Sequence, residues 1–150
     1  MPHSNTSYLI HYTFSTKGRQ RIITNDIRDN LWAYMGGIAR KNKMTCLIAG
    51  GAEDHAHVLV AIPSIMSPAK AVQLIKAGSS KWLREQSASH RDFRWQEGYG
   101  GFSIGVSQID DTVRYIQNQM EHHKITTFEN EYLAFLKRHN IEYDPMYVLD

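Results

Sequence analysis

Hydrophobic and polar residues alternate with a period of two near the start of the chain. Every second residue from Tyr8 to Phe14 is aromatic or aliphatic, and the pattern ends at about Thr16. This period is typical of a half-buried β-strand. Residues 44–49 are predicted to form a second strand, and the GGAED sequence then predicts a tight hairpin into a third strand that ends at Pro63. A further strand, with a glycine-rich bend, is predicted within residues 93–106.

Other segments show the spacing of helices. Residues 25–42 carry apolar side chains at helical intervals, with Thr24 or Asn25 as the predicted cap. A second helix is expected to begin at Ser67-Pro68, because proline is favoured in the first turn of a helix. Two more helices are predicted, one long helix over residues 108–124 and an acidic one over residues 127–140.

The order of these elements favours an α+β fold. Two β-rich units, each crossed by a helix, predict a ferredoxin-like or RRM-like sandwich with a mostly antiparallel sheet of four or five strands and helices on one face. The helix over residues 108–124 is then extra to the sandwich. Such sheets serve RNA-binding modules and metabolic enzymes alike, so the expected fold does not fix the function.

Length and composition predict one globular domain over residues 1–150, with a helical tail from about residue 127. The 150 residues are 42% hydrophobic, which suffices for one ordinary core. The single cysteine, Cys46, excludes an intramolecular disulfide and a pair of cysteine zinc ligands, and it favours a reducing compartment. No signal peptide and no run of about 18 apolar residues is recognisable, which predicts a cytoplasmic protein with no membrane partner.

Charge is unevenly distributed, although the net charge is only +2. The first fifty residues contain seven lysines and arginines and two acidic residues, whereas the last fifty contain four basic and eight acidic residues. An ordinary solvated surface and a face that binds a polyanion both account for this imbalance.

Two histidines stand at the start of the strand that ends at Pro63. Because side chains alternate across a strand, His55 and His57 share the face opposite the apolar residues Ala56 and Val58. Their Cα atoms are expected about 6.6 Å apart, so both imidazoles can reach one metal ion. The alternative is a pair of solvent-exposed histidines at a strand end.

A second group of candidate residues lies on the helix predicted over residues 108–124. Its apolar stripe from Ile109 to Met120 is predicted to pack on the body of the protein. Tyr115 and Gln119 lie one turn apart on a neighbouring stripe, with Cβ atoms about 5–6 Å apart. Taken alone, they are better explained as a border residue and a solvated residue, and the spacing leaves open whether they face the histidines.

If the two groups meet, the chemistry they favour is attack on a phosphodiester. A tyrosine hydroxyl, with a pKa of about 10, is a poor nucleophile and needs a polarised electrophile. A divalent ion on a nonbridging phosphate oxygen supplies this, because it stabilises the charge that grows there. Two imidazoles and the Gln119 carbonyl would leave coordination positions for that oxygen and for water. Mg²⁺ and Mn²⁺ are both candidates. Imidazole more usually binds transition metals than Mg²⁺, so Mn²⁺ is at least as good a candidate.

These residues carry a resemblance to a known family. His55-Ala56-His57, an apolar strand and a YxxxQ helix about sixty residues later resemble the single-tyrosine HUH transposases of bacterial insertion sequences, the IS200-like transposase family, and their REP-associated relatives. SYLIHYTFSTK, IKAGSSKWL, WQEGYGGFSIGVS and EHHKITTFENEYLAFLKRHNIEYD look like family segments in family order, so the resemblance covers nearly the whole chain. Ala56 departs from the family, which usually has a larger aliphatic residue at this position.

The resemblance implies a metal-dependent transposase that nicks single-stranded DNA at element ends marked by hairpins. Such an enzyme forms a 5′-phosphotyrosine link, leaves a free 3′-OH and then rejoins strands. By position, Tyr115 matches the nucleophile, His55 and His57 match metal ligands, and Gln119 matches the third ligand. The implied cofactor is Mg²⁺ or Mn²⁺, and the implied partners are single-stranded DNA, DNA hairpins and a second copy of the chain whose tyrosine helix completes the site.

Basic residues in two segments fit a DNA partner, because lysine and arginine hold phosphates without reading the sequence. The predicted DNA-binding residues are Lys17, Arg19, Arg21, Lys70, Lys76, Lys81 and Arg84. Three aromatic residues, Trp95, Tyr99 and Phe102, are candidates for base stacking, although aromatic residues in a strand more often belong to the core.

Two other functions fit parts of the pattern. A non-catalytic or domesticated nucleic-acid-binding module would use the sheet and the basic residues, but it would need none of the four candidate site residues. A histidine-triad nucleotide hydrolase also has alternating histidines on a strand. Here the next residue on that face is Leu59, where the triad chemistry requires histidine, so this function is set aside.

Overall fold

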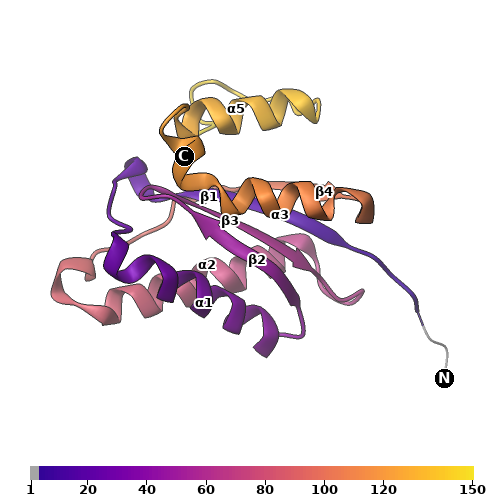
Figure 1. The fold of residues 1–150 in the computed structure, drawn as a ribbon, viewed down its shortest axis with the longest axis horizontal. Helices are drawn as coiled ribbons and strands as arrows, with labels where there is room; N and C mark the ends of the chain where they lie inside the picture. Colours follow the sequence, from indigo (N-terminus) through magenta and orange to yellow (C-terminus); the bar gives the residue numbers. More distant parts are fainter. Residues whose placement is uncertain (1–3) are drawn as a thin grey trace.

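A four-stranded antiparallel sheet forms the centre of the computed structural model, which describes residues 4–150 (Figure 1). Its strands are β1 (Leu9–Ser15), β2 (Thr45–Gly51), β3 (His55–Ala61) and β4 (Gly100–Ile104), in the spatial order β2-β3-β1-β4. The chain turns from β2 directly into β3, as the hairpin prediction required, and β1 pairs with β3 on one side and β4 on the other. The expected fold class is confirmed, with four strands.

Helices α1 (Asn25–Lys41) and α2 (Pro68–Gln86) cover one face of this sheet (Figure 1). Thr24 takes the cap position of α1, and Ser67 caps α2 by accepting a hydrogen bond of 3.0 Å from the backbone N–H of Lys70. Both starts agree with the sequence prediction, although only the Ser67 hydroxyl satisfies a free N–H group of the first turn.

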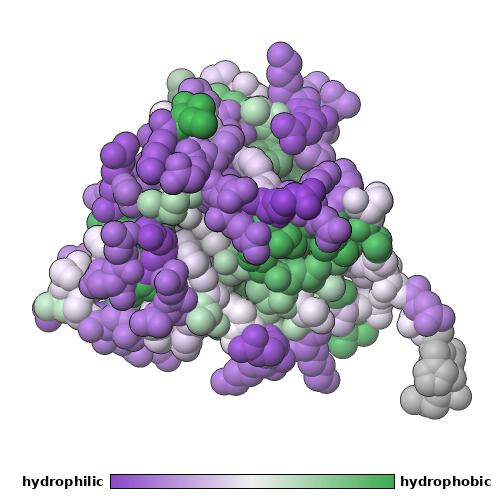
Figure 2. Space-filling model, in the orientation of Figure 1, coloured by the Kyte–Doolittle hydropathy of each residue, from purple (hydrophilic) through white to green (hydrophobic). Residues whose placement is uncertain are grey.

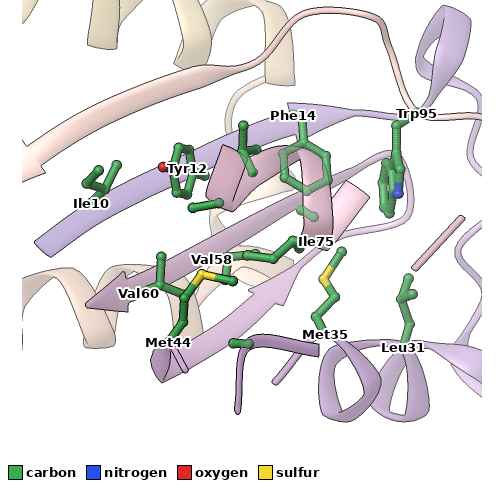
Figure 3. Close-up of a cluster of buried hydrophobic side chains, with 14 of the residues drawn as sticks. Ile10, Tyr12, Phe14, Leu31, Met35, Met44, Val58, Val60, Ile75 and Trp95 are labelled. Atoms are coloured by element: carbon green, nitrogen blue, oxygen red, sulfur yellow. The ribbon is translucent and has the colours of Figure 1, made fainter. Parts of the chain in front are cut away.

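The main hydrophobic core lies between these two helices and the sheet (Figure 3). Tyr12 and Phe14 of β1 and Val58 of β3 point into it and meet Met35 of α1 and Ile75 of α2. Alternate residues of β1 and β3 face this core, as the strand period predicted. The prediction that β1 is half-buried is wrong, because all of its residues are buried. The other residues of both strands face the opposite side of the sheet.

That opposite side is covered by three short helices, α3 (Ile109–Gln117), α4 (Gln119–His123) and α5 (Phe128–Arg138) (Figure 1). The prediction of one long helix over residues 108–124 is wrong. At Asn118 the backbone leaves helical geometry, with φ −95° and ψ 17°, and asparagine is a weak helix former. A second, smaller core holds these helices on the sheet and contains Phe102, Phe128, Tyr132, Phe135 and Leu136.

Three single-turn 3₁₀ segments complete the description: Lys17–Arg19, Ala88–His90 and Val106–Gln108. Within residues 4–150, none of the helices combines the length and the apolar character that crossing a bilayer would require.

Candidate active site

His55 and His57 lie on the covered second face of the sheet and are buried, with 1% and 0% of their surface exposed. On β1 they stand opposite Ser15 and Thr13. The interpretation of these histidines as a solvent-exposed pair is therefore wrong, because α3, α4 and α5 cover the face that the strand pattern left free. Buried polar groups need partners, so their contacts identify the site.

A glycine allows the tyrosine helix to approach these histidines. Gly50 of β2 pairs with His57 across the hairpin. A Cβ atom at this glycine would lie 2.9 Å from Cγ2 and 3.0 Å from the backbone oxygen of Ile116. Ile116 is the buried residue of the apolar stripe of α3. The missing side chain thus sets how closely α3 can pack on the sheet.

Gln119 meets His55, as the predicted site required. Its Oε1 lies 2.8 Å from Nε2 of His55, and its Nε2 donates to the backbone oxygen of Tyr115 at 3.3 Å. The second contact joins residues one helical turn apart. It fixes the orientation of the Gln119 amide, so that its carbonyl oxygen faces His55.

Asp54 holds the other side of the His55 ring. Nδ1 of His55 lies 2.8 Å from Oδ1 of Asp54. Burial opposes the charged imidazolium, but the bond to Asp54 and the nearby Glu131 outweigh it and raise the pKa of His55. A proton on each ring nitrogen suits this position, because Nε2 faces the acceptor oxygen of Gln119. A metal ion at Nε2 would take the place of that proton.

His57 is held between a histidine and a carboxylate. Its Nδ1 lies 2.7 Å from Nε2 of His11, and its Nε2 lies 2.9 Å from Oε1 of Glu131. Burial lowers the pKa of His57, and burial followed by the proximity of His57 lowers that of His11. Both rings are therefore suited to the neutral form, in which imidazole binds metals.

Tyr115 points into the same cluster. Its hydroxyl donates to Oε2 of Glu131, and Nε2 of His122 lies 3.3 Å from the hydroxyl oxygen. Its ring centroid lies 5.6 Å from that of His57. Burial of the phenol, together with the Glu131 carboxylate, raises the pKa of Tyr115 far above its ordinary value. The hydroxyl is therefore protonated at neutral pH.

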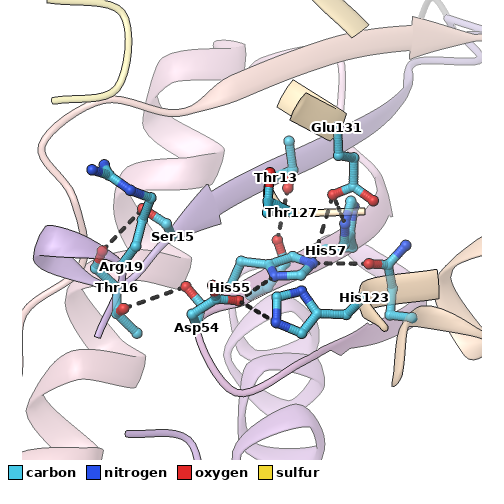
Figure 4. A network of polar contacts seen from close by, with 12 residues as sticks. Thr13, Ser15, Thr16, Arg19, Asp54, His55, His57, His123, Thr127 and Glu131 are labelled. Carbon is cyan, nitrogen blue, oxygen red and sulfur yellow. Dashed lines mark hydrogen bonds and ion pairs between the residues drawn. The ribbon is translucent and has the colours of Figure 1, made fainter. Parts of the chain in front are cut away.

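Glu131 of α5 is the carboxylate at the centre of the site, and the sequence analysis missed it (Figure 4). It is 5% exposed and touches His57, Tyr115 and His122. Burial disfavours its charge, but His57 outweighs this and lowers the pKa of Glu131 to about 2. A signal was present, because Glu131 lies three residues after Phe128 and thus interrupts the apolar face of α5 with a single acid.

His11, His122 and His123 also belong to this region, although the sequence assigned them no role. His123 lies near Asp54, with 3.6 Å between Nε2 and Oδ1, and neither of its buried ring nitrogens has a hydrogen-bond partner among the described residues. Figure 4 shows the rings of His55 and His123 gathered around Asp54.

Two overlapping groups of side chains have the spacing of a metal site. The ligand atoms of His55, His57 and Glu131 lie within 4.8 Å of one another, and so do those of Asp54, His55 and His123. In the first group, Oε1 of Glu131 lies 2.9 Å from Nε2 of His57 and 3.6 Å from Nε2 of His55. Oε1 of Gln119 lies 2.8 Å from the same nitrogen of His55. An octahedral ion with bonds of about 2.1 Å has neighbouring ligand atoms about 3.0 Å apart. The nitrogen and oxygen donors present therefore fit a divalent ion of this kind.

The predicted DNA-binding residues are divided over the surface. Lys17, Lys76 and Arg84 line a groove of about 840 Å³ beside α2, together with the unpredicted Arg91 and Arg94. The exposed residues Arg21, Lys70 and Lys81 lie outside the groove lining. Arg19 forms an ion pair of 2.9 Å with Glu129 of α5.

Lys76 has a structural role within that groove. Its Nζ donates to the backbone oxygens of Gln96, Glu97 and Gly98 at 2.7, 3.1 and 2.9 Å. Among the aromatic candidates, Trp95 and Phe102 are buried core residues, whereas Tyr99 is 37% exposed and lines the groove. The core interpretation thus holds for two of the three.

Comparison with known proteins identifies the family. The model of the family described as "Transposase IS200 like" matches residues 4–119. The chain belongs to this family. It is therefore a member of a group of DNA-processing enzymes of transposition, as the resemblance implied. The matched region ends at Gln119, so α5 and Glu131 lie beyond it.

Individual relatives agree with this assignment. The transposases for insertion sequence element IS200 of Salmonella typhimurium and Salmonella typhi are each 26% identical over 133 residues, which cover 83% of this chain and 85% of theirs. A provisionally assigned transposase of Deinococcus radiodurans R1 has a similar fold, with a TM-score of 0.63 and 17% identity, over 80% of this chain and 96% of that one.

A REP-associated tyrosine transposase bound to a REP hairpin is also similar in structure. Its TM-score is 0.55 at 14% identity, over 79% of this chain and 72% of that one. At such identities, the two structural similarities establish the fold.

Proposed function

We propose that this family member is a metal-dependent transposase that nicks and rejoins single-stranded DNA with Tyr115 as the nucleophile. One observation carries the proposal: α3 and α4 bring Tyr115 and Gln119 onto the buried pair His55 and His57, more than fifty positions away in sequence. A non-catalytic binding module has no use for a phenol, two imidazoles and an amide oxygen that converge in this way.

His55, His57 and the Gln119 carbonyl are the proposed metal ligands, and Mg²⁺ or Mn²⁺ is the proposed ion. Their spacing fits such an ion, as described above, and the imidazole nitrogens make the transition metal Mn²⁺ at least as good a candidate as Mg²⁺. When bound, the ion would act as a Lewis acid on a phosphodiester oxygen. Asp54 and His11 are proposed to orient the two imidazoles, because a ligand histidine needs a partner on its other ring nitrogen.

Tyr115 carries out the proposed covalent step. Its oxygen bonds to phosphorus, the bond from phosphorus to the 3′ oxygen breaks, and that oxygen leaves as a free 3′-OH with the proton that the tyrosine gives up. The product is a 5′-phosphotyrosine link, which preserves the energy of the phosphodiester. Attack of a 3′-OH on this link reverses the reaction and rejoins the DNA.

Single-stranded DNA next to a hairpin is the proposed substrate. The structural relative bound to a REP hairpin supports this, as does the groove lined by Lys17, Arg84, Arg91 and Arg94. The groove begins close to the site, because Lys17 follows Thr16, whose N–H donates to the backbone oxygen of Asp54 at 2.8 Å. Exposed basic residues there would hold phosphates of the bound DNA.

A homodimer is proposed as the assembled form. β2 is an edge strand with half-buried apolar residues. On the side of the molecule drawn in Figure 2, a mainly hydrophobic area lies near the middle and is bordered by polar side chains. Such an edge favours association with a second copy. We further propose that residues 1–150 act as one transposase domain in the cytoplasm, where bacterial DNA lies.

The test uses labelled single-stranded oligonucleotides taken from the DNA that flanks the gene. The protein is incubated with them in Mn²⁺, Mg²⁺ or EDTA, and covalent adducts are detected on a denaturing gel. We expect a metal-dependent adduct in which the protein is linked to the 5′ end of the fragment downstream of the break. This adduct should disappear in Tyr115→Phe and persist in Tyr34→Phe, which changes an exposed tyrosine of α1. Tight hairpin binding without an adduct in either metal would instead support the binding module.

A further inference from the structure

The two carboxylate oxygens of Glu131 face two different parts of the site. Oε1 lies 2.9 Å from Nε2 of His57, and Oε2 accepts the hydrogen bond of the Tyr115 hydroxyl. We propose that Glu131 is a further ligand of the metal through Oε1 and, through Oε2, the residue that positions the nucleophile beside that metal. This inference rests on the proposed function and adds to it a residue outside the region that the family model matches.

The burial of Glu131 supports a role in the site. A carboxylate that is 5% exposed loses several kcal/mol of hydration unless charges or donors compensate for it. The polar partners of Glu131 are His57, Tyr115 and His122, with His55 slightly farther away. Its neighbours along α5 are the aromatic residues Phe128 and Tyr132. Within residues 4–150, the ion-pair partners of this acid are histidines of the site, and no lysine or arginine pairs with it to explain it as a surface charge.

The position of Oε1 is that of a ligand. It lies 2.9 Å from Nε2 of His57 and 3.6 Å from Nε2 of His55. Neighbouring ligand atoms around an octahedral ion are about 3.0 Å apart, so the first distance matches and the second is somewhat longer. Gln119 approaches His55 from α4, and Glu131 approaches His57 from α5. His55 is thus approached by both oxygens, and the Glu131 oxygen lies near both histidines. The negative charge of Glu131 would also offset the charge of a divalent ion, which a neutral amide does not do.

The position of Oε2 places the nucleophile. One carboxylate group joins Oε1 and Oε2 rigidly, so a hydroxyl held by Oε2 stays at a fixed distance from whatever Oε1 binds. His122 supports this arrangement, because its Nε2 lies 3.2 Å from Oε2 and 3.3 Å from the Tyr115 oxygen. Pre-positioning of reacting groups is worth large factors in rate, since small displacements of a nucleophile are costly.

The test separates the ligand role from the positioning role with two variants. Glu131→Gln keeps an acceptor oxygen for Tyr115 but removes the charge, whereas Glu131→Met has a similar volume and removes both oxygens. Glu129→Gln is the matched control, because Glu129 lies on the same helix and contacts Arg19 instead of the site. Folding of each variant is checked by circular dichroism and thermal melting.

Metal binding is the first readout and needs no DNA. The electron paramagnetic resonance signal of free Mn²⁺ is followed during titration of each protein. We expect Glu131→Gln and Glu131→Met to weaken Mn²⁺ binding tenfold or more, and Glu129→Gln to leave it unchanged. Wild-type affinity in both Glu131 variants would overturn the ligand role. If Glu131→Met fails to fold, Glu131→Gln alone decides this point.

The position of Tyr115 is the second readout. Tyrosine labelled with ¹³C at Cζ gives one signal for each of the eight tyrosines, and Tyr115→Phe identifies the signal of residue 115. Because paramagnetic broadening falls steeply with distance, saturating Mn²⁺ should broaden this signal strongly in the wild type and in Glu131→Gln, and clearly less in Glu131→Met. Equal broadening in Glu131→Met would overturn the positioning role.

Failure of the proposed function would look different. A covalent DNA adduct that survives in Tyr115→Phe would overturn the choice of nucleophile, whatever the Mn²⁺ titrations show. Conversely, an adduct that depends on Tyr115 while both readouts on Glu131 stay at wild-type values would overturn only the role of Glu131.

Discussion

His11 and His57 lie on neighbouring strands, with 2.7 Å between Nε2 of the first and Nδ1 of the second. His11 is buried, with 3% of its surface exposed. A hydrogen bond at Nδ1 of His57 determines how the ring is rotated and which nitrogen is presented to Glu131 and to a metal. His11 therefore acts on the site through His57.

Replacing His11 with phenylalanine should weaken metal binding. The aromatic ring keeps most of the packing against Phe135 and Phe102, but the partner of Nδ1 is lost. We expect Mn²⁺ affinity to fall about 10- to 100-fold, as for other partners of ligand histidines. Isothermal titration calorimetry measures this. His90→Phe, in a distant 3₁₀ turn, is the control, and an unchanged affinity in His11→Phe would contradict the orienting role.

Gly50→Ala should move α3 away from the sheet. The new Cβ would lie 3.0 Å from the backbone oxygen of Ile116, which no side-chain rotation can relieve. We expect a loss of about 1–3 kcal/mol in the free energy of unfolding and a fall in adduct formation on the order of a hundredfold. Urea denaturation and the gel assay measure the two effects.

Gly37→Ala is the matched control for this prediction. The nearest atom to its added Cβ is Nη2 of Arg40, at 3.8 Å, and this end of a flexible side chain can move. Because alanine favours the interior of α1, the variant should gain about 0.5–1 kcal/mol and retain activity. A Gly50→Ala protein that behaves in the same way would show that α3 does not need the glycine.

The Glu131 carboxylate should make the free energy of unfolding depend on pH in the acid range. The pKa of Glu131 is lowered from its ordinary value of 4.5 to about 2 in the folded protein. A lowered folded-state pKa stabilises the fold above about pH 4.5, and this contribution is lost as the pH falls toward 2. In EDTA, wild type should therefore exceed Glu131→Gln in stability at pH 6, and the difference should shrink between pH 4.5 and 2. Urea titrations at several pH values measure it; a constant difference would contradict the shift.

Lys76 and Lys81 should behave differently although both lie on α2. Lys76→Met leaves three backbone oxygens without their donor and should cost about 2 kcal/mol of stability. Lys81 is exposed, so Lys81→Met should change stability by less than about 0.5 kcal/mol. Loss of a phosphate contact at Lys81 should reduce the slope of log affinity against log salt by about 0.7 for single-stranded DNA. Equal effects of both variants on stability would contradict this division.

The faces of the strands and the starts of the helices could be predicted because they depend on local chemistry. The period of two in β1 assigned Tyr12 and Phe14 to the core, and the Ser67-Pro68 pair located the start of α2. The end of α3 was missed, because a break at Asn118 involves a single residue of modest helix propensity within an otherwise periodic segment.

The candidate site was predicted in part. His55, His57, Tyr115 and Gln119 stand at spacings that a strand and a helix convert directly into shared faces. Glu131 interrupts the apolar face of α5, but neither Glu131 nor His11 has a spacing that links it to His55 and His57. Each reaches the site on a different element of the fold. Lys76 was misleading for the same reason, since its three acceptors lie about twenty positions away.

The sequence by itself determined which residues share a face: the two histidines on one side of β3, and the tyrosine one turn from the glutamine. Hydrophobic periodicity and backbone geometry are enough for that, because both act over a few residues. Only the tertiary structure decided that these faces meet, that they are buried, and that Glu131 joins the tyrosine to the histidines. Such contacts depend on how closely the helices pack on the sheet. At Gly50 the absence of a side chain allows α3 to come close, and this residue is far away in sequence from Tyr115 and Gln119.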